Sequence, residues 1–228
     1  MMFMFKKALI ILSLSSVVIV PSLATQVQAA TPPTQEKATT YASNKNIRTA
    51  TYGEEIWVSL TSPIPAGWVI VRTLGTQNLI RNMNGASYGT EVEVLLASPI
   101  PSGWVMVRAF RGSNVIKNVN GASYGTEVEV MLASPIPVGW VMVRAFGGSN
   151  VIRNVHDASY GTEVEVMLAS PIPKGWVMVR TYGGSNVIRN VNGAPNGTQI
   201  EVLQASPVPE GWIILSSGGK SKVIRKIG

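Results

Sequence analysis

The chain has 228 residues, of which 46% are hydrophobic and 14% are charged, and its formal net charge is +7. This composition is too apolar for an intrinsically disordered chain and is sufficient for a packed core. The lack of cysteine excludes a disulfide framework and a thiol-linked lipid anchor.

The first 43 residues have the pattern of an export signal and a linker. Lys6 and Lys7 precede an apolar run over residues 8–20, and a small-x-small sequence ends near Ala29. This order predicts a secretory signal peptide over residues 1–29, with a retained N-terminal anchor as the alternative. Residues 30–43 are rich in Thr, Pro, Gln, Ala and Lys without periodicity, which predicts a flexible spacer. Removal of the signal peptide leaves a net charge of +5.

A sequence of the form Ser-Pro-x-Pro-x-Gly-Trp recurs through the rest of the chain. Its tryptophans are spaced by 36 residues and are Trp68, Trp104, Trp140, Trp176 and Trp212. A fixed period of this length indicates a repeat architecture, in which each unit buries a face against its neighbours.

Three short strands are expected in each unit. In the fourth unit they are residues 162–169, 176–182 and 186–191, because Val and Leu alternate with polar residues in the first two. If the first two strands pair with each other, Glu165 faces Arg180 and Val166 faces Val179. Gly183-Gly184 suits a tight turn between the second and third strands.

The fold expected is all-β, with five tandem three-stranded antiparallel meanders stacked as an open array. The β-repeat domain covers residues 44–228, with units at about 51–86, 87–122, 123–158, 159–194 and 195–228. Residues 46–48, Asn-Ile-Arg, resemble one extra third strand, and the two end units differ from the central ones. Unlike ends favour an open stack over the alternative, a small five-bladed ring that resembles a propeller.

Little in the sequence points to catalysis. His156, the sole histidine, and its neighbour Asp157 stand where other units carry Asn-Gly, so drift of one copy explains them best. The glutamates two residues apart on the first strand of each central unit are expected to form structural ion pairs rather than a hydrolytic carboxylate pair. The expected ion-pair residues are Glu93, Arg108, Glu129, Arg144, Glu165 and Arg180. We expect no enzyme activity, no catalytic residue, no metal site and no cofactor.

The tryptophan column is the candidate recognition feature. One indole per unit offers a row of flat surfaces for sugar rings, while the alternative is that each Trp packs on its own hairpin. The leading functional hypothesis is therefore a secreted, multivalent binding protein for a cell-wall polymer or an extracellular glycan. The alternatives are a self-assembling structural protein of a matrix, fibre or spore coat, and a secreted toxin or antimicrobial.

The expected location is extracellular, either free or associated with the cell surface. No transmembrane span is expected after signal removal, and self-association through exposed end strands is a further expectation. Nucleic acid is not an expected partner, because the protein is predicted to be secreted and the third and fourth units are close to neutral.

Overall fold

The computed structural model describes residues 50–228, which belong to the second of two compact units, residues 45–228. The predicted signal peptide, spacer and extra strand at residues 46–48 lie outside the described residues. The described part of the chain contains strands and turns but no helix, and hence no helix that could span a membrane. Its strands are β1(Glu55–Ser59), β2(Trp68–Leu74), β3(Gln77–Asn82), β4(Glu91–Leu95), β5(Trp104–Ala109), β6(Ser113–Asn118), β7(Glu127–Met131), β8(Trp140–Ala145), β9(Ser149–Asn154), β10(Glu163–Met167), β11(Trp176–Thr181), β12(Ser185–Asn190), β13(Gln199–Leu203), β14(Trp212–Gly218) and β15(Ser221–Lys226).

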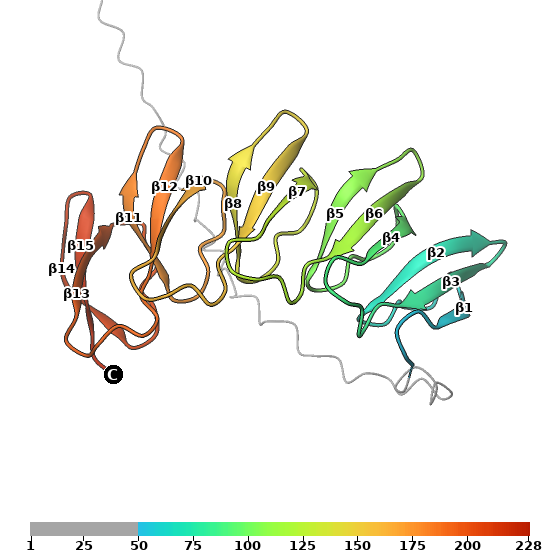
Figure 1. Ribbon diagram of the computed structural model, residues 1–228, viewed down its shortest axis with the longest axis horizontal. Coiled ribbons are helices and arrows are strands. Elements are labelled where there is room, and N and C mark those ends of the chain that lie inside the picture. Colours follow the sequence, from blue (N-terminus) through green and yellow to red (C-terminus); the bar gives the residue numbers. More distant parts are fainter. Residues whose placement is uncertain (1–49) are drawn as a thin grey trace, which may run out of the picture. The chain divides into compact units, whose positions relative to one another are not determined.

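These strands form five three-stranded antiparallel sheets, one for each repeat. Figure 1 shows the sheets following one another in sequence order. Strand contacts between sheets join only neighbours, through the pairs β2–β4, β5–β7, β8–β10 and β11–β13. The first and last of these sheets do not touch, so the predicted open array of five tandem units is confirmed, and the alternative of a closed ring is not.

The third strand lies in the centre of every sheet. In the fourth unit, β12 pairs with β10 on one side and with β11 on the other. The predicted hairpin at Gly183-Gly184 is therefore formed, but the predicted pairing of the first strand with the second is wrong. The loop at residues 168–175 is long enough to return along the sheet, which leaves room for β12 between the two strands.

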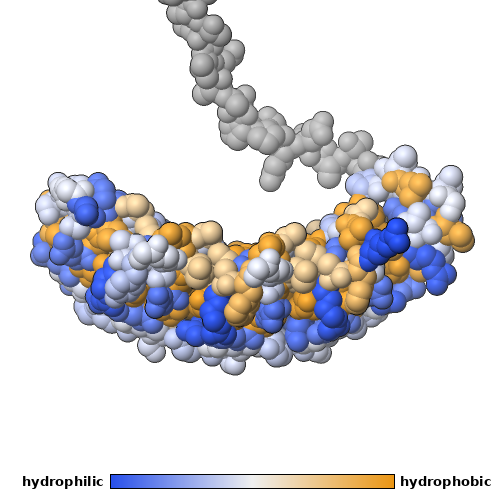
Figure 2. Space-filling view, turned by 90° about the horizontal axis from the view of Figure 1, so that it is seen from above, coloured by the Kyte–Doolittle hydropathy of each residue, from blue (hydrophilic) through white to orange (hydrophobic). Residues whose placement is uncertain are grey.

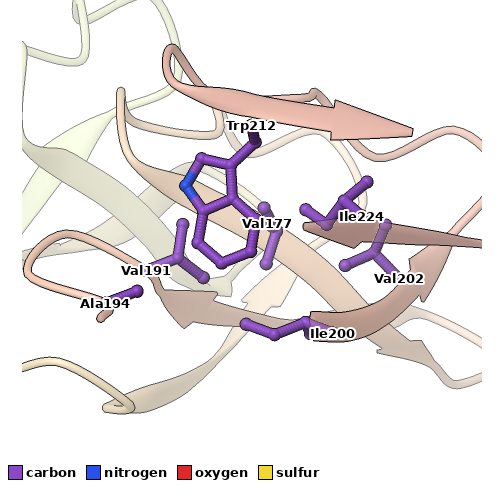
Figure 3. Packing of buried hydrophobic residues seen from close by; sticks show 7 residues of the cluster. All are labelled: Val177, Val191, Ala194, Ile200, Val202, Trp212 and Ile224. Atoms are coloured by element: carbon purple, nitrogen blue, oxygen red, sulfur yellow. The ribbon is translucent and has the colours of Figure 1, made fainter. Parts of the chain in front are cut away.

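Each of the three central sheets buries apolar side chains on both faces, because it lies between two other sheets. Val164, Val166 and Trp176 pack against Val141 of the third unit. Val177, on the opposite face, packs with Val202 and Trp212 of the fifth unit, as Figure 3 shows. Val166 and Val179 thus belong to different cores, and the single aliphatic face predicted from the sequence is wrong. The stabilising unit is the junction between sheets rather than the isolated sheet.

In each of the first four units, the second strand has a β-bulge whose backbone N–H donates to a serine of the next unit. The pairing of β11 with β12 shifts register between Met178 and Arg180, and the equivalent strands share this β-bulge. Ser206 Oγ accepts the N–H of Met178 at 2.9 Å. The same bond joins the other pairs of neighbouring units, through Ile70 N to Ser98, Met106 N to Ser134, and Met142 N to Ser170. The serine that begins the Ser-Pro sequence therefore links one sheet to the next.

Candidate functional site

The five tryptophans proposed as recognition surfaces are buried, four of them between sheets and Trp68 in a cluster of the first unit. Trp68, Trp104, Trp140, Trp176 and Trp212 are 2%, 3%, 4%, 3% and 7% exposed. In Figure 3 the indole of Trp212 lies among the aliphatic side chains of the fourth and fifth units. The indole faces are thus covered and cannot serve as open platforms, and their main role is to fill the junctions.

The arginines of the predicted ion pairs bind the other glutamate of each first strand. Arg108, Arg144 and Arg180 pair with Glu91, Glu127 and Glu163, the first of these at 2.6 Å. Their predicted partners Glu93, Glu129 and Glu165 instead accept hydrogen bonds at 2.5 Å from Ser113, Ser149 and Ser185. The prediction chose the wrong carboxylate because it placed the first and second strands side by side.

Each pairing glutamate joins all three strands of its sheet. Glu127 binds Arg144 of β8 and also Arg153 of β9, where Nη2 lies 2.5 Å and Nε 2.9 Å from Oε1. The hydrogen bonds from Arg153 and Arg144 lower the pKa of Glu127 despite partial desolvation. Glu163 is held in the same way by Arg189 and Arg180. These pairs are half-exposed, so they pin the sheet rather than form a reactive centre.

His156 and Asp157 form an exposed contact rather than an acid–base centre. His156 Nδ1 lies 2.9 Å from Asp157 Oδ1, and the two side chains are 70% and 83% exposed. Asp157 adopts a left-handed φ of 61°, at the position where Gly85, Gly121 and Gly193 have φ near 80°. No group of three or more potential metal ligands occurs within residues 50–228. This geometry agrees with a loop substitution and offers no reactive constellation.

Similar pockets recur at the junctions between sheets, at the end of each sheet where its second strand begins. Pockets of about 310, 490 and 570 Å³ open at the junctions of units one and two, three and four, and four and five. Each is lined by the same loop elements from two adjacent units. The first contains Gly67, Met83, Asn84, Pro101, Ser102, Trp104, Asn118 and Asn120. Trp104 is among the lining residues although it is only 3% exposed.

Glycine and asparagine shape these pockets. Gly103 has a φ of 76°, and the amide of Asn120 occupies the space that a Cβ would need, with Oδ1 at 1.9 Å from that point. Gly67 and Gly175 are covered in the same way by Asn84 and Asn192. The exposed amide therefore rests on bare backbone, which leaves its polar atoms at the pocket surface.

A second asparagine, the last residue of the third strand in each of the first four units, is structural. The side chain of Asn118 donates to the carbonyl of Ala86 at 2.8 Å and accepts the N–H of Asn120 at 3.0 Å. Asn82, Asn154 and Asn190 make the same pair of contacts, with His156 N as the donor to Asn154. These buried amides fix the backbone that carries the exposed amide of each pocket.

The pockets differ in charge along the array. The first is lined only by neutral residues, with Ala66 and Ser102 at its rim. The pocket between the third and fourth units is lined by His156, Asp157 and Lys174. In the last one, Lys174 Nζ lies 3.0 Å from Glu210 Oε2, and this contact lowers the pKa of Glu210. The shared elements are thus amide groups and main chain, whereas the charges are particular to each junction.

The opposite ends of the sheets carry exposed apolar side chains. Phe110, next to the β5–β6 turn, is 54% exposed, and Leu96 at the end of the neighbouring strand is 57% exposed. Figure 2, which looks onto these turns, shows hydrophobic residues gathered along the face. The repeated set is Leu60, Leu74, Leu96, Phe110, Leu132, Phe146, Leu168 and Tyr182.

Sequence reasoning did not select the exposed asparagines Asn84, Asn120 and Asn192. They recur with the 36-residue period, with His156 at the intervening position, and this was a visible signal. Their contact with the proline loop of the next unit depends on how the sheets stack.

Comparison with known proteins gives no further guide to the site. No family model matches the chain, and no curated protein or solved structure is similar to it. Function has to be inferred from the repeated pockets themselves.

Proposed function

We propose that the protein is a secreted, non-enzymatic, multivalent binding protein that acts at the cell envelope or on extracellular glycan. Its binding sites are the junction pockets. The observation that carries this proposal is the recurrence of one pocket type, built from equivalent residues, at three junctions.

The chemistry of the pockets suits neutral, hydroxyl-rich ligands. Asn84 and Asn120 are exposed at the first pocket, and amide groups both donate and accept hydrogen bonds. The adjoining Pro101 and the small exposed part of Trp104 supply apolar contact for the carbon face of a sugar ring. No charged side chain lines this pocket, which favours a glycan over a strongly anionic polymer.

Repetition compensates for shallow individual sites. A pocket that is open to solvent on one side holds a ligand weakly, but a polymer that repeats its own units can occupy several pockets at once. Linked sites raise the overall affinity by about 10²–10⁴-fold over a single site. A repeating glycan is therefore a better match to this surface than a single small molecule.

The test is retention of the purified protein on peptidoglycan, on teichoic acid and on insoluble polysaccharides. The wild-type protein is compared with a triple variant, Asn84→Ala with Asn120→Ala and Asn192→Ala. We expect retention on at least one polymer and at least a tenfold loss in the triple variant. Asn196→Ala is the matched control, because Asn196 is also exposed but lies outside the pockets.

Two outcomes would count against this function. Failure of the wild-type protein to bind any of the polymers would remove the proposal as a whole. Binding that the triple variant retains in full would show that the polymer occupies another surface, such as the apolar hairpin ends.

A further inference from the structure

The outer face of the last sheet exposes side chains that every earlier junction buries. Ile213 of β14 is 41% exposed, whereas the residues at its position in the other four units are all 0% exposed. These four are Val69, Val105, Val141 and Val177. Ile227 is 57% exposed, and its equivalents Met83, Val119, Val155 and Val191 are each 2% exposed. The fifth sheet thus presents the half of a junction that normally receives the next unit.

The neighbouring residues extend this open face. Leu215 is 44% exposed, and Ile214, at the position of the bulge residues Met106 and Met142, is 51% exposed. At that position the N–H donates to a serine of the following unit in all four junctions. The N–H of Ile214 is therefore at the position that donates to a serine hydroxyl of the next unit in the four earlier sheets.

The fifth sheet also differs from the central sheets in charge. Gln199 and Ser216 stand where the fourth sheet carries the ion pair of Glu163 and Arg180. The fifth sheet thus lacks this ion pair, although the internal junctions of the central sheets form with the pair in place.

The four junctions within the chain define what fits this face. Val69 of the first unit packs with Val92, Val94 and Trp104 of the second, and Ile100 contacts the same cluster. The first sheet has the matching residue types at these positions, namely Ile56, Val58, Ile64 and Trp68. The first three are half-buried, whereas Trp68 is 2% exposed. Ser62 stands at the position of the linking serines Ser98 and Ser134.

We propose that the outer face of the fifth sheet docks the first sheet of a second copy of this chain. The contact repeats the internal junctions, and Ser62 of the second copy accepts the N–H of Ile214. Because the two surfaces differ, the association is head-to-tail and leaves a free face at each end, so it continues beyond the dimer. The product is a longer row of the same units.

The experiment is sedimentation velocity of the purified protein over a wide concentration range, with far-ultraviolet circular dichroism to verify that each variant is folded. The wild-type protein should form a ladder of species beyond the dimer as concentration rises. Ile213→Asp with Leu215→Asp should block the outer face of the fifth sheet, which we call the tail. Ser62→Arg should block the docking face of the first sheet, which we call the head. Each blocked variant alone should associate at least tenfold more weakly than the wild type.

Mixing the two blocked variants separates the possible arrangements. One variant keeps a head and the other keeps a tail, so an equimolar mixture should form a 1:1 dimer and stop there. Leu132→Asp is the control, because Leu132 is 58% exposed at a hairpin end, far in sequence from both end sheets. It should assemble like the wild type.

Several results would overturn the proposal. A wild-type protein that stays monomeric at every concentration would mean that the face is covered within the chain or by another partner. Dimerisation of the head-blocked variant by itself would indicate tail-to-tail pairing. Loss of assembly in Leu132→Asp but not in the end variants would place the contact at the hairpin ends.

Discussion

The hydroxyl of Ser170 accepts a hydrogen bond from the backbone N–H of Met142, 2.9 Å away, across the junction between the third and fourth units. Ser170 is 8% exposed and Met142 is 7% exposed, so water does not readily replace the hydroxyl. The bulge in β8 frees this N–H from the ladder, and the next unit supplies its acceptor. A local irregularity in one sheet thus becomes the point of attachment for another.

Ser170→Ala should therefore destabilise the protein by about 1–3 kcal/mol, the usual cost of leaving a buried donor unsatisfied. Urea-induced unfolding would measure the change. Ser62→Ala, measured on protein dilute enough that the proposed association does not occur, is the matched control. The described residues place no unit before the first sheet, so its effect on the monomer should be close to zero. Equal stability of the Ser170 variant and the wild type would mean that water satisfies the N–H of Met142.

Truncation of a central tryptophan should cost much more. Trp140 is 4% exposed and packs with Val105, Val119, Val130 and Ile152 of two adjacent units. Trp140→Ala should lower the free energy of unfolding by about 3–5 kcal/mol, because it leaves a cavity inside the junction. Thermal unfolding followed by circular dichroism would show this as a lower midpoint. A variant that kept its stability but lost glycan retention would restore the tryptophans as recognition residues.

The glycines that support the pocket amides should tolerate no side chain. Gly103→Ala should destabilise by more than 1 kcal/mol, because the new Cβ meets Asn120 and the φ of 76° is unfavourable for alanine. Gly147→Ala is the control, since no atom lies within 4 Å of its would-be Cβ. The two variants can be compared by chemical denaturation, and similar losses from both would argue against the close contact between Asn120 and Gly103.

Acid should weaken the sheets through their bridging glutamates. The pKa values of Glu127 and Glu163 lie below the ordinary 4.5, because Arg153 and Arg189 donate to them, with further bonds from Arg144 and Arg180. A lowered folded-state pKa stabilises the native state above 4.5, and this contribution is lost as the pH falls through the folded-state value.

The pH dependence of unfolding between neutral pH and pH 2 would test this effect. The double variant Glu127→Gln with Glu163→Gln should lose less stability than the wild type on acidification. Glutamine suits the position, because the fifth unit already has Gln199 there. An unchanged dependence on pH in the double variant would mean that other groups govern the acid response.

The sequence predicted the strands, their tandem repetition and the second hairpin of each unit. Alternation of Val164 and Val166 with glutamates marked β10, and Gly183-Gly184 marked the turn before β12. The order of the strands in the sheet could not be predicted, because the alternation in the first strand suits pairing with the second strand or with the third. The sequence also contained a sign that both faces of each central sheet are buried, but the prediction placed the apolar residues on one face. Adjacent large residues, Trp176 and Val177, point to opposite faces of a strand, and both are buried.

The candidate site was less accessible to sequence reasoning. The amides that line the pockets recur with the period, but so do residues with purely structural roles, such as Asn118 and Asn154. What separates the two kinds is whether the side chain is buried and bonded to the backbone of the preceding unit, as Asn118 is to the Ala86 carbonyl, or is exposed at the pocket, as Asn120 is. That distinction depends on contacts between loops of neighbouring units, which residue spacing does not encode.

The serine link has a consequence for how such a chain evolves. Every central repeat brings a hydroxyl for the sheet before it and a free N–H for the sheet after it, so duplication or deletion of a whole 36-residue block joins compatible partners at the seam. Copy number can therefore drift through unequal recombination while the protein still folds, and natural variants should differ by complete blocks rather than by fragments of one.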